Sequence, residues 1–120
     1  AGVAWDRAEA TRLADGNSTT VDLIIKTFLA DLRETLPKAE RAALARDCAT
    51  LAGLAHRWKG SLGLLGARSA QSSAVALENA CRLGEPERLL ECFDRLRQEL
   101  LTIESAMSDA TKENATCKSS

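Results

Sequence analysis

The sequence predicts an all-α fold, an antiparallel four-helix bundle with a short N-terminal helix. Apolar residues recur at alternating steps of three and four residues in four segments, which is the spacing of one helix face. Aromatic residues make up only 3% of the chain and there is no tyrosine, which argues against a β-sandwich or barrel. At 120 residues and 45% hydrophobic, the chain fits one domain with a substantial core.

The N-terminal part of the chain is predicted to hold one short helix and one long helix. Residues 5–15 have helical composition but little length, and the polar run 15–18 forms a turn. We expect the long helix to begin at Thr19, with Asp22 as its capping partner three residues later. Pro37 should kink or break this helix, because proline lacks a backbone N–H donor. The apolar stripe consists of Val21, Ile25, Phe28, Leu32 and Leu36.

Three more helices are predicted in the second half of the chain. One spans 48–65 and stops at Gly66, and the next spans 69–83. Gly84 breaks the pattern, and Pro86 suits the first turn of the last helix. The stripe of that helix consists of Leu89, Phe93, Leu96, Leu100, Ile103 and Met107.

These elements divide the chain into two parts. We expect the bundle to occupy residues 1–108. Residues 109–120 are polar and lack apolar periodicity, so we expect a flexible, frayed tail there.

Composition excludes several kinds of function. The net charge of −1 argues against a surface for nucleic acid or for an anionic membrane, since both need clustered positive charge. The chain has no apolar run of the roughly 18 residues that a transmembrane helix needs, and no signal-peptide pattern. Its only histidine, His56, rules out a multi-histidine metal site within one chain.

The cysteines do not form a metal-binding pattern. There are four of them, and no two are spaced as CxxC. An even number would permit two disulfides, but Cys48, Cys81 and Cys92 lie in helical patterns and resemble small apolar residues. We therefore expect reduced, structural thiols, the fourth being Cys117.

The helix predicted at 48–65 carries His56 on its solvent side. On a helical wheel, His56 lies roughly 140° from the centre of the apolar stripe. The stripe consists of Leu51, Ala55, Trp58, Leu62 and Leu65. A solvent-facing histidine without a function is one interpretation of this position, and its neighbours favour another.

The positions around His56 hold unusually small residues. Each glycine inside a helix costs about 0.5–1 kcal/mol relative to alanine, and three of them occur here. Such a cost favours a surface cleared for another macromolecule, while close packing by a neighbouring helix is the alternative. The neighbouring positions are Ala49, Ala52, Gly53, Gly60 and Gly63.

The histidine and a nearby lysine suggest a chemistry. Neutral imidazole is a nucleophile near pH 7, because its reference pKa is about 6.5. Lys59 lies one helical turn beyond His56, where a cation would favour the neutral ring and then compensate phosphoryl oxygens. The pair is suited to accepting a phosphoryl group.

Here the residues resemble a known family. Residues 56–61, His-Arg-Trp-Lys-Gly-Ser, and 65–67, Leu-Gly-Ala, resemble the His-x-x-Lys-Gly-Ser…Gly-Ala signature of histidine phosphotransfer (HPt) domains. The resemblance extends over most of residues 3–108 and includes the order of the helices. Trp58 stands where leucine is commoner in the family, which suits its place in the apolar stripe.

The resemblance implies a helical bundle that relays phosphate. An exposed histidine receives a phosphoryl group from the aspartyl phosphate of one receiver domain and passes it to another receiver. By this resemblance His56 would accept the group, Lys59 would stabilise it, and Gly60 would clear room for the receiver. We expect the receiver to be contacted also by Ala52, Gly53, Gly63 and Leu64.

The same resemblance sets the expected cofactors and partners. We expect a phosphoryl carrier rather than an enzyme, with no ATP site and no cofactor of its own, and with Mg²⁺ on the receiver. The partners would be receiver domains of response regulators or of a hybrid kinase, with no nucleic acid and no membrane contact. We expect a cytoplasmic monomer. The missing Met and the polar tail favour the C-terminal module of a hybrid sensor kinase over a free-standing protein.

One alternative of a different class stays open. The chain could be a helical interaction module that binds a signalling partner without phosphoryl transfer, since some proteins of this fold lack the histidine. The presence of both His56 and Lys59 favours the carrier.

Overall fold

Five helices form the described part of the chain. The computed structural model describes residues 5–119, with side chains from residue 5 to residue 108. No strand occurs within that range, so the predicted all-α class is confirmed. In chain order the helices are α1 (Arg7–Leu13), α2 (Ser18–Ala45), α3 (Cys48–Leu64), α4 (Arg68–Leu83) and α5 (Pro86–Ser119).

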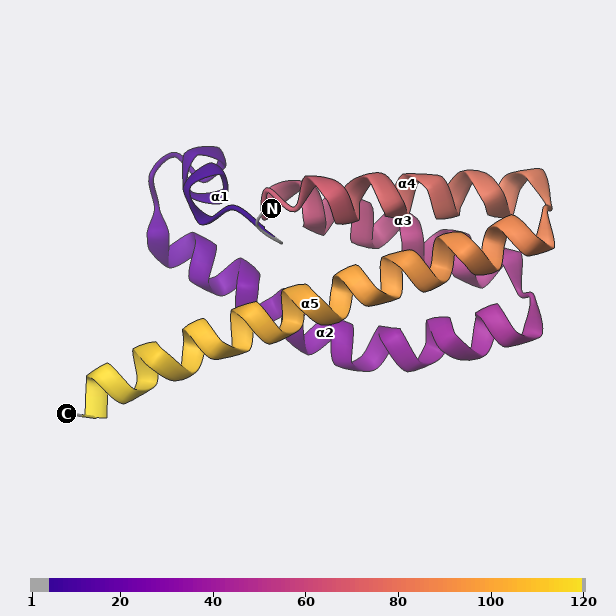
Figure 1. Ribbon diagram of the computed structural model, residues 1–120. Helices are drawn as coiled ribbons and strands as arrows, with labels where there is room; N and C mark the ends of the chain where they lie inside the picture. Colours follow the sequence, from indigo (N-terminus) through magenta and orange to yellow (C-terminus); the bar gives the residue numbers. More distant parts are fainter. Residues whose placement is uncertain (1–4, 120) are drawn as a thin grey trace.

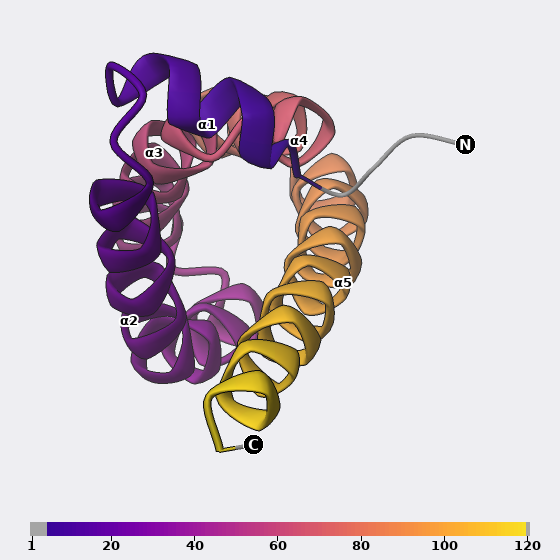
Figure 2. The ribbon, with the colours of Figure 1, turned by 90° about the vertical axis from the view of Figure 1, so that its left-hand side faces the viewer.

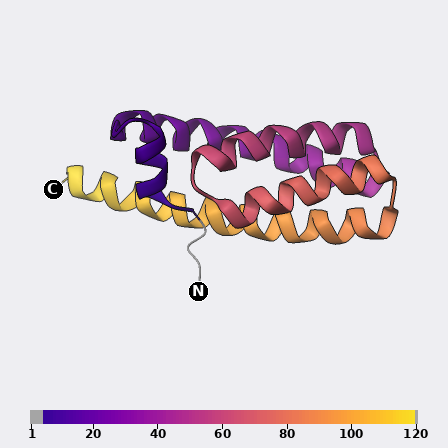
Figure 3. The same ribbon diagram turned by 90° about the horizontal axis from the view of Figure 1, so that it is seen from above.

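The four long helices form an antiparallel bundle, and the short helix lies across one end of it. Helices α2 to α5 run side by side along the long axis of the molecule (Figures 1 and 3). Seen along that axis, α1 crosses the end of the bundle at which α3 passes into α4 (Figure 2). The backbone N–H of Asp6 donates to the carbonyl of Leu65 at 3.1 Å, which fixes α1 over that turn.

The start of α2 differs from the prediction. Asn17 caps the helix, and its side chain accepts from the backbone N–H of Thr20 at 3.1 Å, so the helix begins one residue before Thr19. Asp22 caps nothing and instead accepts from the Arg7 guanidinium of α1 at 2.6 Å. Asparagine is as good a cap as threonine or better, and it lies at the end of the turn.

A kink or a break was predicted at Pro37, and the break does not occur, while the kink stays a prediction. Helix α2 continues through Pro37 and ends at Ala45. A proline inside a helix costs about 3 kcal/mol or more. Leu36 and Ala39, on either side of it, are both buried in the core, and their burial holds the helix together across the proline.

Glycines end α3 and α4 as predicted. Gly66 and Gly84 have φ values of +67° and +64°, a conformation that residues with a Cβ rarely adopt. After Gly66, the N–H of Ala67 donates to the carbonyl of Leu62 at 3.0 Å, which closes the end of α3. The tight turns bring α3 against α4 and α4 against α5.

Helix α5 is longer than the sequence predicts. It continues to Ser119, through residues that were expected to leave the helix after residue 108. Lack of an apolar stripe means only that nothing buries the helix there, and alanine, lysine and glutamate are good helix formers. The flexibility of this segment stays a prediction, and residue 120 lies outside the described residues.

The core lies between the four long helices. All five residues of the predicted α3 stripe are fully buried, including Trp58. Its indole N–H donates to the hydroxyl of Thr35 in α2 at 3.2 Å, so the one polar atom of this large side chain has a partner. The described cysteines, in α3, α4 and α5, are free thiols. Within the described residues, no helix is long and apolar enough to span a membrane.

Candidate functional site

The middle of α3 presents His56 to solvent. Its side chain is 67% exposed, while Trp58, two residues later, is fully buried. The orientation follows from the apolar stripe: once that stripe is packed in the core, a residue roughly 140° away must point outward. The predicted exposure of His56 is confirmed.

One carboxylate of α4 joins the histidine and the lysine. The Nδ1 atom of His56 lies 3.1 Å from Oε2 of Glu78, and the Lys59 ammonium donates to Oε1 of Glu78 at 3.1 Å. A guanidinium nitrogen of Arg82 lies 3.3 Å from Oε2. The Glu78 side chain is only 10% exposed. Its carboxylate therefore lies largely enclosed between the side chains of His56, Lys59 and Arg82. This arrangement fixes the imidazole at one nitrogen and the lysine at its end.

Glu78 remains a carboxylate at neutral pH. Its pKa is lowered from the usual value near 4.5, first because Lys59 donates a hydrogen bond to it, and further because Arg82 and His56 do so. Its partial burial acts in the opposite direction and does not outweigh them. A carboxylate can only accept hydrogen bonds, so Nδ1 of a neutral His56 must carry the proton. The lone pair is then on Nε2, the ring nitrogen away from Glu78.

The three glycines of α3 have different surroundings. A Cβ atom at Gly53 or Gly60 would meet no atom within 4 Å among the described residues, apart from its own helix. At Gly63 it would lie 2.7 Å from the Gln71 side-chain nitrogen of α4. Helix packing therefore explains Gly63, as the alternative interpretation held. It does not explain Gly53 and Gly60, which leave open space beside His56.

No metal site accompanies these residues. Among the residues whose side chains are described, no group of three or more His, Cys, Asp or Glu is placed to hold a metal ion. The acidic residue nearest to the histidine, Glu78, is already occupied by three partners from the chain itself.

Comparison with known proteins decides the family. The family model described as Hpt domain matches residues 23–106, which include all of α3 and α4 and most of α2. The chain belongs to the Hpt domain family. Hpt domains are carriers in histidine phosphotransfer and have no catalytic ATP site, and they interact with receiver domains. A comparison with curated proteins and one with solved structures each gave no match.

The four residues predicted to contact a partner of this Hpt domain differ in their exposure to solvent. Leu64 is 50% exposed at the end of α3, whereas Ala52 is half-buried and packs against the core. Gly63 lies beside α4. Gly53 is open, so it and Leu64 are the most accessible of the four.

Two groups of the Hpt domain site were missed by sequence reasoning. Glu78 and Arg82 come from α4, and nothing in the spacing of the α3 motif points to them. A weak signal existed, because Glu78 lies about 70° from the centre of the apolar stripe of α4, at its edge. A carboxylate so near a core face needs partners. Which partners it would find depended on how α4 packs against α3.

A further ion pair ties α3 to α2 beside the histidine. The guanidinium of Arg57 is paired with the carboxylate of Asp31. His56 is thus flanked by side-chain contacts on both sides, to α4 through Glu78 and to α2 through its neighbour Arg57.

Proposed function

We propose that His56 accepts a phosphoryl group from the aspartyl phosphate of a receiver domain and passes it to a second receiver. The observation that carries this proposal is the position of His56, which is exposed and bound at Nδ1 by Glu78 while Gly53 and Gly60 leave room beside it. The reacting nitrogen is then Nε2, since it holds the lone pair and faces away from α4.

In the proposed transfer, one bond to phosphorus forms on His56 as another breaks on the receiver aspartate. The Nε2 lone pair of His56 attacks the phosphorus in line, the bond from phosphorus to the aspartyl oxygen breaks, and the aspartate leaves as a carboxylate. The proton stays on Nδ1, so the phosphorylated ring carries positive charge. Glu78, which already accepts from Nδ1, stabilises that charge. Transfer to the second receiver is the same step in reverse.

Lys59 is the group that we assign to the phosphoryl oxygens. It lies one turn from His56 on the same helix, and Glu78 holds its ammonium. Its side chain is 31% exposed, so it can turn toward an incoming anion. The Mg²⁺ that we expect would be bound by the receiver and would neutralise phosphate charge there. Gly60 would allow the receiver surface to approach closely.

Partner contact is proposed for the exposed face of α3. Gly53 and Leu64 form part of it, together with the half-buried Ala52 and Gly63 at its edges. The partners would be receivers of response regulators or of a hybrid kinase. We place the domain in the cytoplasm, where such receivers act. The expected monomeric state stays a prediction that light scattering can check.

Labelling with a phosphorylated receiver tests the proposal. The wild-type chain should take up acid-labile, base-stable phosphate, and His56→Gln should take up none. Since the chain has one histidine, the variant removes all imidazole chemistry. Circular dichroism of the variant controls for folding. Its helical spectrum should match that of the wild type, because the side chain of His56 is exposed.

The outcome also separates the two functional classes. Equal labelling of wild type and His56→Gln, or no labelling of either by any of several receivers, would overturn the carrier function. In the second case, retained binding of a receiver would favour the interaction module that transfers no phosphate.

A further inference from the structure

Two cations share one carboxylate beside His56. The Lys59 ammonium donates to Oε1 of Glu78 at 3.1 Å, and a guanidinium nitrogen of Arg82 lies 3.3 Å from Oε2. The Glu78 side chain is only 10% exposed, so water cannot readily replace a partner that leaves it. A carboxylate with two cationic partners can give up one of them and still remain paired. In the proposed function Lys59 is the one that leaves, because it binds the phosphoryl oxygens.

The two cations reach Glu78 from different helices. Arg82 lies four residues after Glu78 on α4, so its contact with the carboxylate does not depend on how α3 packs. Lys59 lies on α3, one turn beyond His56, so its side chain can turn toward a phosphoryl group on that ring without movement of either helix. Arg82 is therefore the cation that stays with Glu78.

The guanidinium of Arg82 can also take the place that the ammonium leaves. A guanidinium carries five N–H donors in a planar fork that matches the two oxygens of a carboxylate, whereas an ammonium is a single point of charge. Lys59 now occupies Oε1 of Glu78, and Arg82 shares Oε2 with Nδ1 of His56. The Arg82 side chain is 67% exposed, so little packing opposes a shift toward Oε1.

We propose that Arg82 is a positioning residue of the phosphotransfer site, which replaces Lys59 at Glu78 when Lys59 turns to the phosphoryl group. This inference rests on the proposed phosphorylation of His56, and it assigns to Arg82 a role that acts through Glu78 rather than on the phosphate. Only hydrogen bonds are exchanged in this step. When the phosphoryl group leaves, Lys59 returns to Oε1 and Arg82 to Oε2. The carboxylate is paired in both states, so it keeps its hold on Nδ1 of His56.

The absence of Arg82 would hold Lys59 back. Of the three side chains that contact Glu78 in the described part of the chain, His56 and Lys59 would remain. Departure of Lys59 would then leave a largely buried carboxylate without a cation while the phosphoryl group approaches, and this cost opposes the departure. We therefore expect Arg82→Ala to lower the rate of phosphoryl uptake by about tenfold.

Labelling with a phosphorylated receiver measures this rate. It is carried out at about pH 8, where imidazole is largely neutral because its reference pKa is about 6.5, so a change in the protonation of His56 does not enter. Arg82→Ala should take up label about tenfold more slowly than the wild type. Circular dichroism should show the same helical spectrum for both proteins, because the Arg82 side chain is exposed.

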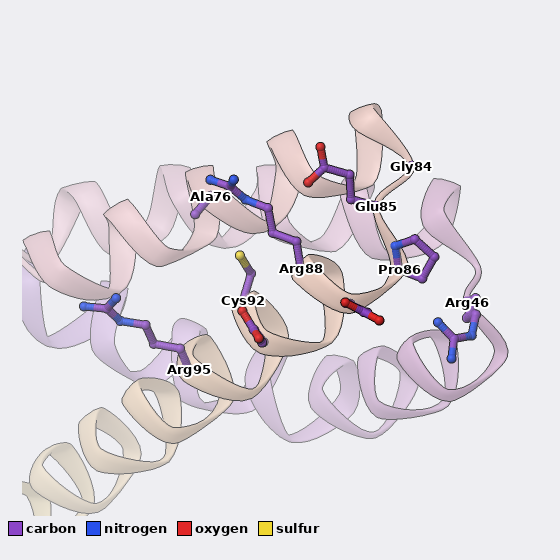
Figure 4. A pocket seen from close by; sticks show the side chains of 10 residues that line it. Arg46, Ala76, Gly84, Glu85, Pro86, Arg88, Cys92 and Arg95 are labelled. Atoms are coloured by element: carbon purple, nitrogen blue, oxygen red, sulfur yellow. The ribbon is translucent and has the colours of Figure 1, made fainter.

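Arg95→Ala is the matched control. Arg95 is 77% exposed and is also paired with a glutamate four residues away, Glu99, at 3.9 Å. It lines a groove together with Arg88 and Cys92 (Figure 4), and none of these residues contacts Glu78 through a printed ion pair. Its removal should leave the uptake of phosphate unchanged.

A second background separates a role through Glu78 from direct contact with the phosphate. In Glu78→Gln the neutral amide does not hold Lys59 by charge, so no cation has to be released. Adding Arg82→Ala to this background should change the uptake by less than about twofold. A tenfold loss in both backgrounds would show that Arg82 acts on the phosphate itself. Equal uptake by the wild type and Arg82→Ala would show that it does not act, and either result overturns the proposal while the carrier function stands.

A spectroscopic measurement decides the inference without a receiver. Wild type and Arg82→Ala, with ¹³C-labelled lysine, are phosphorylated on His56 by phosphoramidate, a small phosphoryl donor. The ε-methylene signal of Lys59, which is the one missing in Lys59→Arg, is recorded by NMR before and after phosphorylation. The signal should shift in the wild type and less than about half as much in Arg82→Ala, in which Lys59 stays with Glu78.

The outcomes of the two measurements are distinct. Equal shifts of the Lys59 signal in wild type and Arg82→Ala would overturn the proposal, also where Glu78→Gln takes up too little label for a comparison. If no receiver labels the wild type, the proposed transfer from a receiver fails, and the NMR measurement still decides the role of Arg82.

Discussion

The buried and exposed faces of α3 differ in the kind of residue that they hold. The buried face holds Leu51, Trp58 and Leu62, all fully enclosed, and its side chains account for the fold. The exposed face holds Gly53, His56 and Gly60, which add nothing to the core. One helix thus combines residues chosen for packing with residues that lower helix stability. The second set makes sense only if another molecule uses that face.

Trp58→Ala should give the largest change in stability of the variants that test this contrast. Removing a fully buried tryptophan leaves a cavity and should lower the free energy of unfolding by about 3–5 kcal/mol. Urea denaturation measures the change. Leu64→Ala on the exposed side is the control and should change the stability by no more than about 0.5 kcal/mol. Similar losses in the two variants would mean that the faces are not energetically distinct.

Thr35→Val tests the polar contact of the buried face. The hydroxyl of Thr35 accepts from the Trp58 indole, and valine would leave that buried N–H without a partner. We expect a loss of about 1–3 kcal/mol in urea denaturation. Thr35→Ser keeps the hydroxyl and should retain most of the stability. A valine variant as stable as the wild type would show that this hydrogen bond adds nothing.

How much of this could be predicted from the sequence depends on how far apart the interacting residues lie. The α3 stripe and the exposure of His56 follow from periodicity within one helix, and the glycine stops after α3 and α4 are local as well. That α2 continues through Pro37 without a break could not be predicted, because the burial of α2 on both sides of the proline involves contacts with other helices. Glu78 was missed for the same reason, since its role depends on the register of α4 against α3.

Glu78→Gln tests the link between the two helices at the site. The pKa of Glu78 is lowered in the folded protein, so the carboxylate stabilises the fold above its usual pKa near 4.5. This contribution is lost as the pH falls through the lower, folded value. The wild type should therefore be the more stable protein at pH 7, and the difference should shrink below about pH 4.5. Thermal melts across this range measure it.

A matched variant identifies the source of that pH dependence. Glu85→Gln changes an exposed glutamate in the turn between α4 and α5 and should leave the pH profile close to that of the wild type. If Glu78→Gln shows the same profile as the wild type, the contacts of Glu78 with Lys59, Arg82 and His56 do not contribute to stability in solution.

Gly60→Ala should give the smallest change in stability. It tests directly whether glycine on the exposed face lowers the stability of α3. The added methyl group enters open space, and alanine is the better helix former, so stability should rise by about 0.5–1 kcal/mol. Gly63→Ala is the matched control and should gain less. Its methyl group would displace Gln71, which donates to the carbonyl of Lys59 at 3.4 Å.

At Gly60, a substitution that raises stability should lower phosphoryl uptake from a receiver. A larger side chain, as in Gly60→Gln, occupies the space through which a receiver would approach His56, so phosphoryl uptake should fall although the helix is more stable than with glycine. Denaturation and receiver labelling on the same preparations measure the two quantities. A variant that is more stable and transfers phosphate as fast as the wild type would remove the functional reason for glycine at this position. The open space beside His56 would then be a feature of the fold alone.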